Sequence, residues 1–310
     1  MSFLLWLVVF FFSVTLLVKS SAWVVRGASR VGAYFRLPPF IIGIVLVGLG
    51  TSLPELSSSL AAVFQHKGGI VPANIIGSNI VNILLVIGVA ALINHRLIVK
   101  KKIATVDVSL LLGATAVFFF MAIDGKISSV EGIILFLLSL GYLFYNLFQK
   151  DKKALLDKKE RKLKAIDIFQ LVFGLAGLIL GANYTITSLT HLALALKIPE
   201  TLIAATALAL GTSLPELVVS IKAALAKKIE LSLGNIFGSN IFNLLLIGGL
   251  PAMIYPLAID PMMMKIGLPF LGIATVLFSF SCWARKIYFW EGFVYLSLYL
   301  LFLGKISRLF

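Results

Sequence analysis

Long apolar stretches alternate with short polar ones along the whole chain. Each stretch is about as long as a helix needs to cross the roughly 30 Å of hydrocarbon in a bilayer. Five lie in the first half and five in the second. We therefore predict an all-α membrane protein with ten transmembrane helices, at residues 3–18, 39–64, 70–93, 104–123, 131–149, 166–190, 200–226, 231–254, 262–281 and 288–304.

Two motifs occur once in each half of the chain. GTSLPEL at 50–56 recurs without a mismatch at 211–217, an offset of 161 positions. The same offset aligns NIIGSNIVN at 74–82 with NIFGSNIFN at 235–243. Such a duplication at a fixed offset predicts that the two halves are copies of one structural unit.

Each copy has an odd number of predicted crossings, so the second copy must enter the membrane from the opposite side. The predicted architecture is two inverted five-helix repeats, 1–149 and 166–310. A charged linker at 150–165 joins them. In transporters built this way, the substrate site lies near mid-membrane, where the repeats meet.

Basic residues outnumber acidic ones by 27 to 13, which in a soluble protein would suggest nucleic acid as a partner. Their distribution indicates membrane topology instead. With the N-terminus outside, twenty Lys and Arg residues fall on cytoplasmic segments and six on extracellular ones. We predict a monomeric, multi-pass protein of the plasma membrane, with both termini extracellular, lipid as its surroundings and no nucleic-acid partner.

Two acidic residues, Glu55 and Glu216, lie deep in predicted helices at the same position of the two repeats. A charge at this depth costs at least about 2.5 to 3.5 kcal/mol. No Lys or Arg lies at a matching depth to neutralise either carboxylate. We therefore expect both carboxylates to bind cations that arrive from solution.

Other oxygen atoms are expected around each carboxylate. On a helix, Thr51 and Ser52 precede Glu55 by four and three positions and so share its face. Pro54 lacks an N–H, which frees the carbonyl oxygen of Gly50. Hydroxyl, amide, carbonyl and carboxylate oxygens are the ligands of hard cations such as calcium. The remaining candidate ligands are the hydroxyl and amide side chains of Ser78, Asn82, Thr212, Ser213, Ser239 and Asn243.

Charge balance limits what such a pocket holds. Two ionised glutamates are balanced by one divalent ion, or by two or more monovalent ions in neighbouring positions. If the two kinds of ion exclude each other, rocking of one group of helices against the other is sufficient for antiport.

The duplicated GTSLPEL and GSNxxN motifs resemble the alpha repeats of the sodium/calcium exchangers, within the cation/calcium exchanger superfamily. The resemblance spans nearly all ten predicted helices. It implies a secondary active antiporter that exchanges Na+ for Ca2+ without a cofactor, electrogenic as in relatives. It also implies four ion positions between the second, third, seventh and eighth helices, with Glu55 and Glu216 bridging several ions. The backbone carbonyls of Gly48 and Ala209 fall where the family uses main-chain sodium ligands.

The chain departs from the family pattern at a few positions. Some relatives carry an aspartate where this chain has Asn243, and many carry an acid where it has Ala22 and Asn183. The loss of a possible third carboxylate leaves potassium-dependent sodium/calcium exchange and calcium/proton exchange as alternatives. The Thr-Ser pair before each glutamate favours sodium over protons.

Other functions remain to be weighed against transport. A membrane glutamate can be a protonated structural donor, although two of them in symmetric motifs count against this interpretation. An intramembrane enzyme would need a nucleophile and a base, for which Lys19 beside Ser20 is the nearest hint, and this pair has no counterpart in the second repeat. We therefore do not expect an enzyme. A channel would conduct calcium without an opposing sodium gradient.

Overall fold

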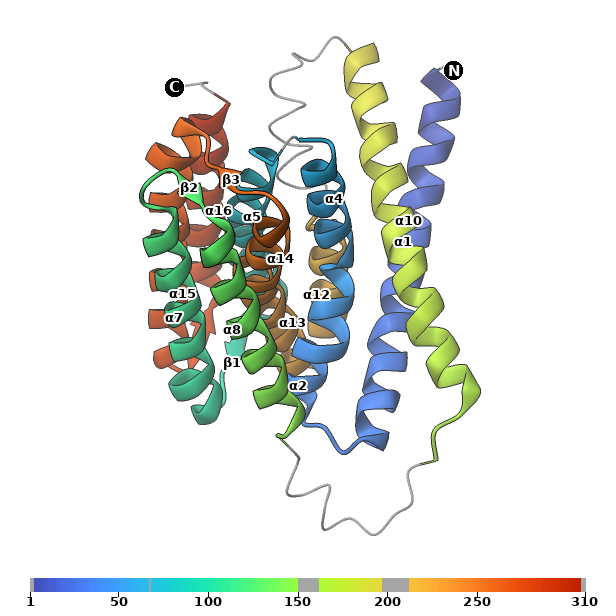
Figure 1. The fold of residues 1–310 in the computed structure, drawn as a ribbon. Coiled ribbons are helices and arrows are strands. Elements are labelled where there is room, and N and C mark those ends of the chain that lie inside the picture. Colours follow the sequence, from blue (N-terminus) through green and yellow to red (C-terminus); the bar gives the residue numbers. More distant parts are fainter. Residues whose placement is uncertain (1–2, 67, 150–161, 197–211, 308–310) are drawn as a thin grey trace.

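The protein is a bundle of long helices that run roughly parallel to one another (Figure 1). Nine helical segments of the described chain are long and apolar enough to cross a membrane. Residues 200–211 of the seventh predicted helix lie outside the described residues, and α12 (Leu214–Leu225) is its described part. The computed structural model describes residues 3–66, 68–149, 162–196 and 212–307.

The first repeat contains five spans, of which the second, third and fourth switch between α-helical and π-helical turns. Its elements are α1 (Phe3–Tyr34); α2 (Pro39–Ile42), η1 (Gly43–Gly48), α3 (Leu49–Thr51) and α4 (Leu53–Phe64); α5 (Ile70–Ile80), η2 (Val81–Val86) and α6 (Ile87–Asn94); η3 (Ile103–Asp107) and α7 (Val108–Ala122); and α8 (Ser129–Leu147).

The second repeat follows the same order. Its described elements are α10 (Ala165–Ala195); α12; α13 (Ile229–Phe242), η4 (Asn243–Ile247) and α14 (Gly248–Ile254); η5 (Met263–Gly267) and α15 (Leu268–Trp283); and α16 (Phe289–Ile306). Most bounds agree with the predicted spans within a few residues. The prediction was too short for α1, which continues to Tyr34 rather than ending at 18, because Arg26 and Arg30 lie on the helix itself.

Large apolar side chains cover the outside of the bundle. Phe12, Phe120 and Leu300 are 71%, 72% and 65% exposed. In water this surface would be unstable, whereas hydrocarbon accommodates it without cost. The bundle is therefore built to stand in a membrane.

The helix ends agree with an inverted arrangement of the repeats. In Figure 1, α1 begins and α16 ends on the same side of the bundle, whereas α8 ends and α10 begins on the opposite side. An odd number of crossings in each repeat produces this arrangement, as the sequence predicts.

Two short antiparallel ladders, one at each end of the bundle, link the repeats. β1 (Arg96–Ile98) pairs with β4 (Lys286–Tyr288), so that Leu97 faces Ile287. β2 (Lys126–Ile127) pairs with β3 (Leu257–Ala258), so that Ile127 faces Leu257. The residues of one pair are related to those of the other by an offset of 160 positions. Such reciprocal pairing is what a two-fold relation between the repeats requires.

A Glu-Gly pair begins the last helix of each repeat. Glu131 caps α8 by accepting hydrogen bonds from the Ser128 N–H at 2.8 Å and the Ser128 hydroxyl at 2.7 Å. The glycine that follows, Gly132, lets α8 lie against α14, because a Cβ there would be 2.7 Å from the Met253 nitrogen. Glu291 and Gly292 act in the same way where α16 meets α6. Each repeat thus closes its last helix onto the third span of the other repeat.

We expect Gly249→Ala to destabilise the protein, because the new Cβ would lie 2.5 Å from the Phe136 nitrogen and 2.9 Å from the Gly132 carbonyl oxygen. Overpacking of this kind costs about 1 to 3 kcal/mol. The control is Gly272→Ala, where no described atom lies within 4 Å of the new Cβ. In detergent, the midpoint temperature of thermal unfolding should fall by a few degrees for Gly249→Ala only. Equal midpoint temperatures for the two variants would contradict the close packing at Gly249.

Candidate functional site

The two predicted carboxylates lie in the centre of the bundle. Glu55 is in the first turn of α4 and Glu216 in the first turn of α12, with 1% and 0% of their surfaces exposed. They are close enough for their charges to repel each other. Neither forms a salt bridge within the described chain, in which the recorded ion pair is Lys100 with Glu230. Two buried acids from opposite repeats therefore share one site without a basic partner.

A break in the helix positions each carboxylate. Ser52 separates α3 from α4 with φ −84° and ψ 1°, outside helical geometry. Pro54 follows in the first turn of α4, where its missing N–H costs nothing. Ser213 and Pro215 do the same before α12. Because each glutamate lies in the first turn after the break, the positive end of the helix dipole favours its ionised form.

The break changes which carboxylate the preceding hydroxyls contact. The sequence predicts that Thr51 and Ser52 lie on the same face as Glu55; instead the Ser52 hydroxyl donates to Oε1 of Glu216 at 3.3 Å. Thr51 also lies beside Glu216, and Thr212 lies beside Glu55. The prediction of one ligand cluster within each motif was therefore wrong, because the non-helical residue 52 disrupts the helical spacing on which it rested.

Hydroxyl and amide groups of the two repeats form a reciprocal network. The Thr51 hydroxyl donates to Oδ1 of Asn235 at 3.3 Å and lies 3.5 Å from the Ser239 hydroxyl. At the equivalent position of the second repeat, the Thr212 hydroxyl donates to Oδ1 of Asn74 at 3.1 Å and lies 3.0 Å from the Ser78 hydroxyl. Each threonine thus contacts the GSN-containing helix of the other repeat.

Sequence reasoning missed Asn74 and Asn235 as members of this network. Asn235 also donates to the Ser220 hydroxyl at 2.8 Å and to the backbone oxygen of Glu216 at 3.3 Å. The signal was present, because Asn74 precedes Ser78 by four residues and so shares its helical face. Asn235 and Ser239 have the same spacing.

Several buried polar atoms, on the glutamate-bearing helices and on the π-helical turns η2 and η4 that pack against them, have no hydrogen-bond partner among the described residues. Native proteins pair most buried polar atoms, so a cluster of unpaired ones calls for an explanation. No group of three or more His, Cys, Asp or Glu side chains occurs in the part of the chain described, so a metal ion here would meet mixed oxygen ligands. The unpaired atoms are both carboxylate oxygens of Glu55, Oε2 of Glu216, the amides of Asn82 and Asn243, and the hydroxyl of Ser213.

A main-chain carbonyl oxygen is also part of the hydroxyl and amide network. The Gly48 carbonyl accepts hydrogen bonds from the Thr51 hydroxyl and the Ser239 hydroxyl, both at 3.3 Å. The two helices approach closely enough for this contact because residue 48 is glycine. A Cβ there would lie 3.1 Å from the backbone oxygen of Asn235. Ala209, the second carbonyl expected from the resemblance, lies outside the described residues.

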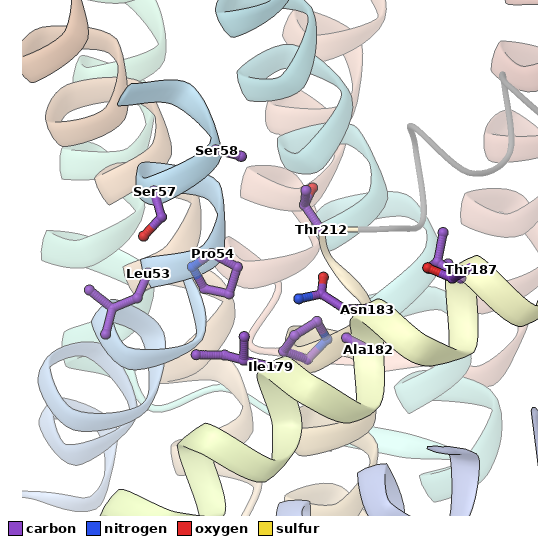
Figure 2. Close-up of a pocket in the computed structure, with 11 residues that line it drawn as sticks. Leu53, Pro54, Ser57, Ser58, Ile179, Ala182, Asn183, Thr187 and Thr212 are labelled. Atoms are coloured by element: carbon purple, nitrogen blue, oxygen red, sulfur yellow. The ribbon is translucent and has the colours of Figure 1, made fainter. Parts of the chain in front are cut away.

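A cavity of about 660 Å³ leads to the site between α4 and α10. Figure 2 shows Asn183 of α10 in the space between Pro54 and Thr212. Thr212 lines the cavity and also contacts Ser78, so it joins the cavity to the network. The polar residues Ser57 and Ser58 line the α4 side of this cavity. We define this cavity as the vestibule.

Comparison with known proteins gives consistent matches over the whole chain. A family profile described as "Sodium/calcium exchanger protein" matches residues 5–148 and 166–306. The sodium/calcium exchanger MaX1 of Methanosarcina acetivorans is 33% identical over 93% of this chain and 94% of its own. Inner membrane protein YrbG of Escherichia coli is 32% identical over 87% and 86%.

Solved structures match as well. The sodium-calcium exchanger NCX_Mj superposes with a TM-score of 0.84 and 30% identity, covering 97% of this chain and 98% of that one. The ten-helix inverted-repeat fold, the duplicated motifs and the family profile agree. This chain belongs to the sodium/calcium exchanger family.

Proposed function

We propose that this protein is a secondary active antiporter that exchanges Na+ for Ca2+ by alternating access, with Glu55 and Glu216 at the shared binding centre. One observation carries the proposal: two buried carboxylates lie together with unpaired oxygen atoms around them, and no basic residue in the described part of the chain neutralises them. A buried charge without a partner is costly, so the arrangement favours cations as the missing partners.

The oxygen ligands expected at this site are suited to both calcium and sodium. Calcium takes six to eight oxygen ligands, and two carboxylates neutralise its charge. The expected oxygen ligands of the site, besides the carboxylates, are those of Thr51, Ser52, Ser78, Asn82, Thr212, Ser213, Ser239, Asn243 and the carbonyls of Gly48 and Ala209. The same oxygens can hold sodium ions in neighbouring positions. Because both ions need the same two carboxylates, they compete, and competition for one site is what coupled exchange requires.

An asymmetry between the repeats supports alternating access. The vestibule separates α4 from α10, and Ser58 on α4 is exposed. Val219, the residue equivalent to Ser58, is fully buried on α12, which packs against α1. One half of the site is open and the equivalent half is closed, as expected for one end state of a two-state exchanger.

The positive-inside distribution gives this asymmetry a direction. It places both termini outside the cell and the α12–α13 turn in the cytoplasm. In that orientation the vestibule opens to the outside and the α1–α12 contact closes the inner side. We propose this orientation, in the plasma membrane, for a monomer.

We expect Glu55→Gln and Glu216→Gln each to lower sodium-driven calcium uptake at least tenfold, because each removes one of the two charges that bind the ion. Both variants should remain folded, since a neutral amide is cheaper to bury than a carboxylate. The measurement is calcium uptake into proteoliposomes, with Asp124→Asn as a control on an exposed acid. Wild-type uptake by either glutamate variant would contradict the site.

We expect exchange of three sodium ions for one calcium ion to move net charge. Uptake should therefore change when a potassium gradient with valinomycin sets the membrane potential. External potassium without the ionophore, and pH, are varied separately, because dependence on either would favour the potassium-coupled or proton-coupled alternatives. Calcium uptake that does not change with the membrane potential would rule out this stoichiometry. Calcium flux without any sodium gradient would indicate a channel.

We expect Asn235→Ala to reduce calcium uptake about tenfold. The change removes the acceptor of the Thr51 hydroxyl and the donor to Ser220. The hydroxyl groups beside Glu216 are then no longer held in position. Asn94→Ala is the matched control, since its amide bonds the Ala90 carbonyl of its own helix away from the site. Equal activities of the two variants would remove Asn235 from the network.

A further inference from the structure

A single lysine joins the turn between α12 and α13 to the side of α1. The Lys228 ammonium donates to the Ser29 hydroxyl at 2.8 Å and to the Val25 carbonyl at 3.4 Å. The Ser29 hydroxyl in turn donates to the same carbonyl at 2.6 Å. Lys228 thus lies where the proposed inner closure ends, at the cytoplasmic edge of the α1–α12 contact.

The electrostatic surroundings of Lys228 are unfavourable for a permanent structural contact. Partial burial, and the charges of Arg30 and Arg26 on α1, lower the pKa of Lys228. Among the described residues it forms no salt bridge, unlike Lys100, which pairs with Glu230 at 2.8 Å. Its acceptors are a neutral hydroxyl and a carbonyl. Attraction to two neutral oxygens against two like charges gives a contact that is formed but easily broken.

The repeat relation shows what this contact accomplishes. Val25 and Ser29 of α1 correspond to Ile186 and Thr190 of α10 at the offset of 161. Ile186 lines the open vestibule, whereas Val25 is bound by Lys228 and buried. Val25 is therefore buried under a contact with Lys228, whereas its counterpart in the second repeat, Ile186, lines the vestibule.

We propose that Lys228 is a positioning residue of the exchange cycle, holding α1 against α12 and so keeping the inner side closed while the vestibule is open. This inference rests on the proposed alternating access. Opening toward the cytoplasm must separate α1 from α12 and hence break the bonds to Ser29 and Val25. Lys228 does not touch the transported ion, and it acts through the equilibrium between the two states.

The test measures accessibility at two equivalent positions. Single cysteines replace Ser58, which lines the vestibule, and Val219, its buried counterpart on α12. The native Cys282 is fully buried and can remain. The rate of modification by a charged methanethiosulfonate is measured in lipid nanodiscs, where both faces of the protein are accessible.

In a Lys228→Ala background, the Val219→Cys site should be modified about tenfold faster, while the Ser58→Cys site should be modified no faster than before. A tenfold change corresponds to about 1.4 kcal/mol between the states. Ser29→Ala should act in the same direction with a smaller effect. Lys228→Arg, which keeps a charged donor, should restore the original rate.

Lys101→Ala is the matched control, because it removes one exposed charge from the same predicted face of the protein. It should leave both rates unchanged. A rise of both rates together in Lys228→Ala would mean general loosening and would overturn the proposal. An unchanged rate at Val219→Cys would overturn it as well.

Failure of the proposed function would look different. In the wild-type background, the rate at Val219→Cys should respond to replacing sodium by calcium, because ions select between the two states. No response to any ion would count against alternating access itself. A response to ions that Lys228→Ala leaves unaltered would count against the role of Lys228 alone.

Discussion

The rest of this structure depends on two carboxylates that are buried together and have no basic partner among the residues that the structure describes. Glu55 and Glu216 repel each other and lie beyond the reach of water at the bundle surface. Such a pair is tolerated when something else supplies positive charge. Helix starts after residues 52 and 213 supply part of it through their dipoles. In the proposed function, the transported cations supply the remainder, so the protein is most stable with its cargo bound.

The inverted repeats explain why neither half forms the site alone. Ser52 of one repeat donates to Glu216 of the other, and Thr212 reaches back to Asn74. The Glu216 carboxylate therefore accepts a hydrogen bond from the opposite repeat, and the threonine of each motif contacts the GSN-containing helix of the opposite repeat. The ladders and the Glu-Gly pairs at the last helices lock the same relation at the ends of the bundle. A site assembled in this way is sensitive to small rotations of one repeat against the other, which is a useful property for a transporter.

Symmetry in sequence does not produce symmetry in conformation. Glu216 accepts hydrogen bonds from Ser52 and Ser239, whereas Glu55 accepts none from the described residues. The helix pair at α10 and α4 encloses the vestibule, whereas the pair at α1 and α12 is packed. In the proposed function, these two equivalent contacts open in turn, which makes the protein a two-state system. The proposed role of Lys228 is a bias on that equilibrium.

The sequence by itself determined the membrane class, the inverted repeats, the helix irregularity just before Pro54 and the identity of the two buried acids. Hydropathy, exact duplication and proline chemistry are local or periodic signals that need no knowledge of distant contacts. Only the tertiary structure decided which hydroxyl contacts which carboxylate. Ser52 is not helical, and the Thr51 and Ser52 side chains lie beside Glu216 of the other repeat. The tertiary structure also revealed Asn235 and Lys228 as cross-repeat and cross-helix partners. Such contacts depend on how helices pack, and a single sequence does not encode that geometry in any local pattern.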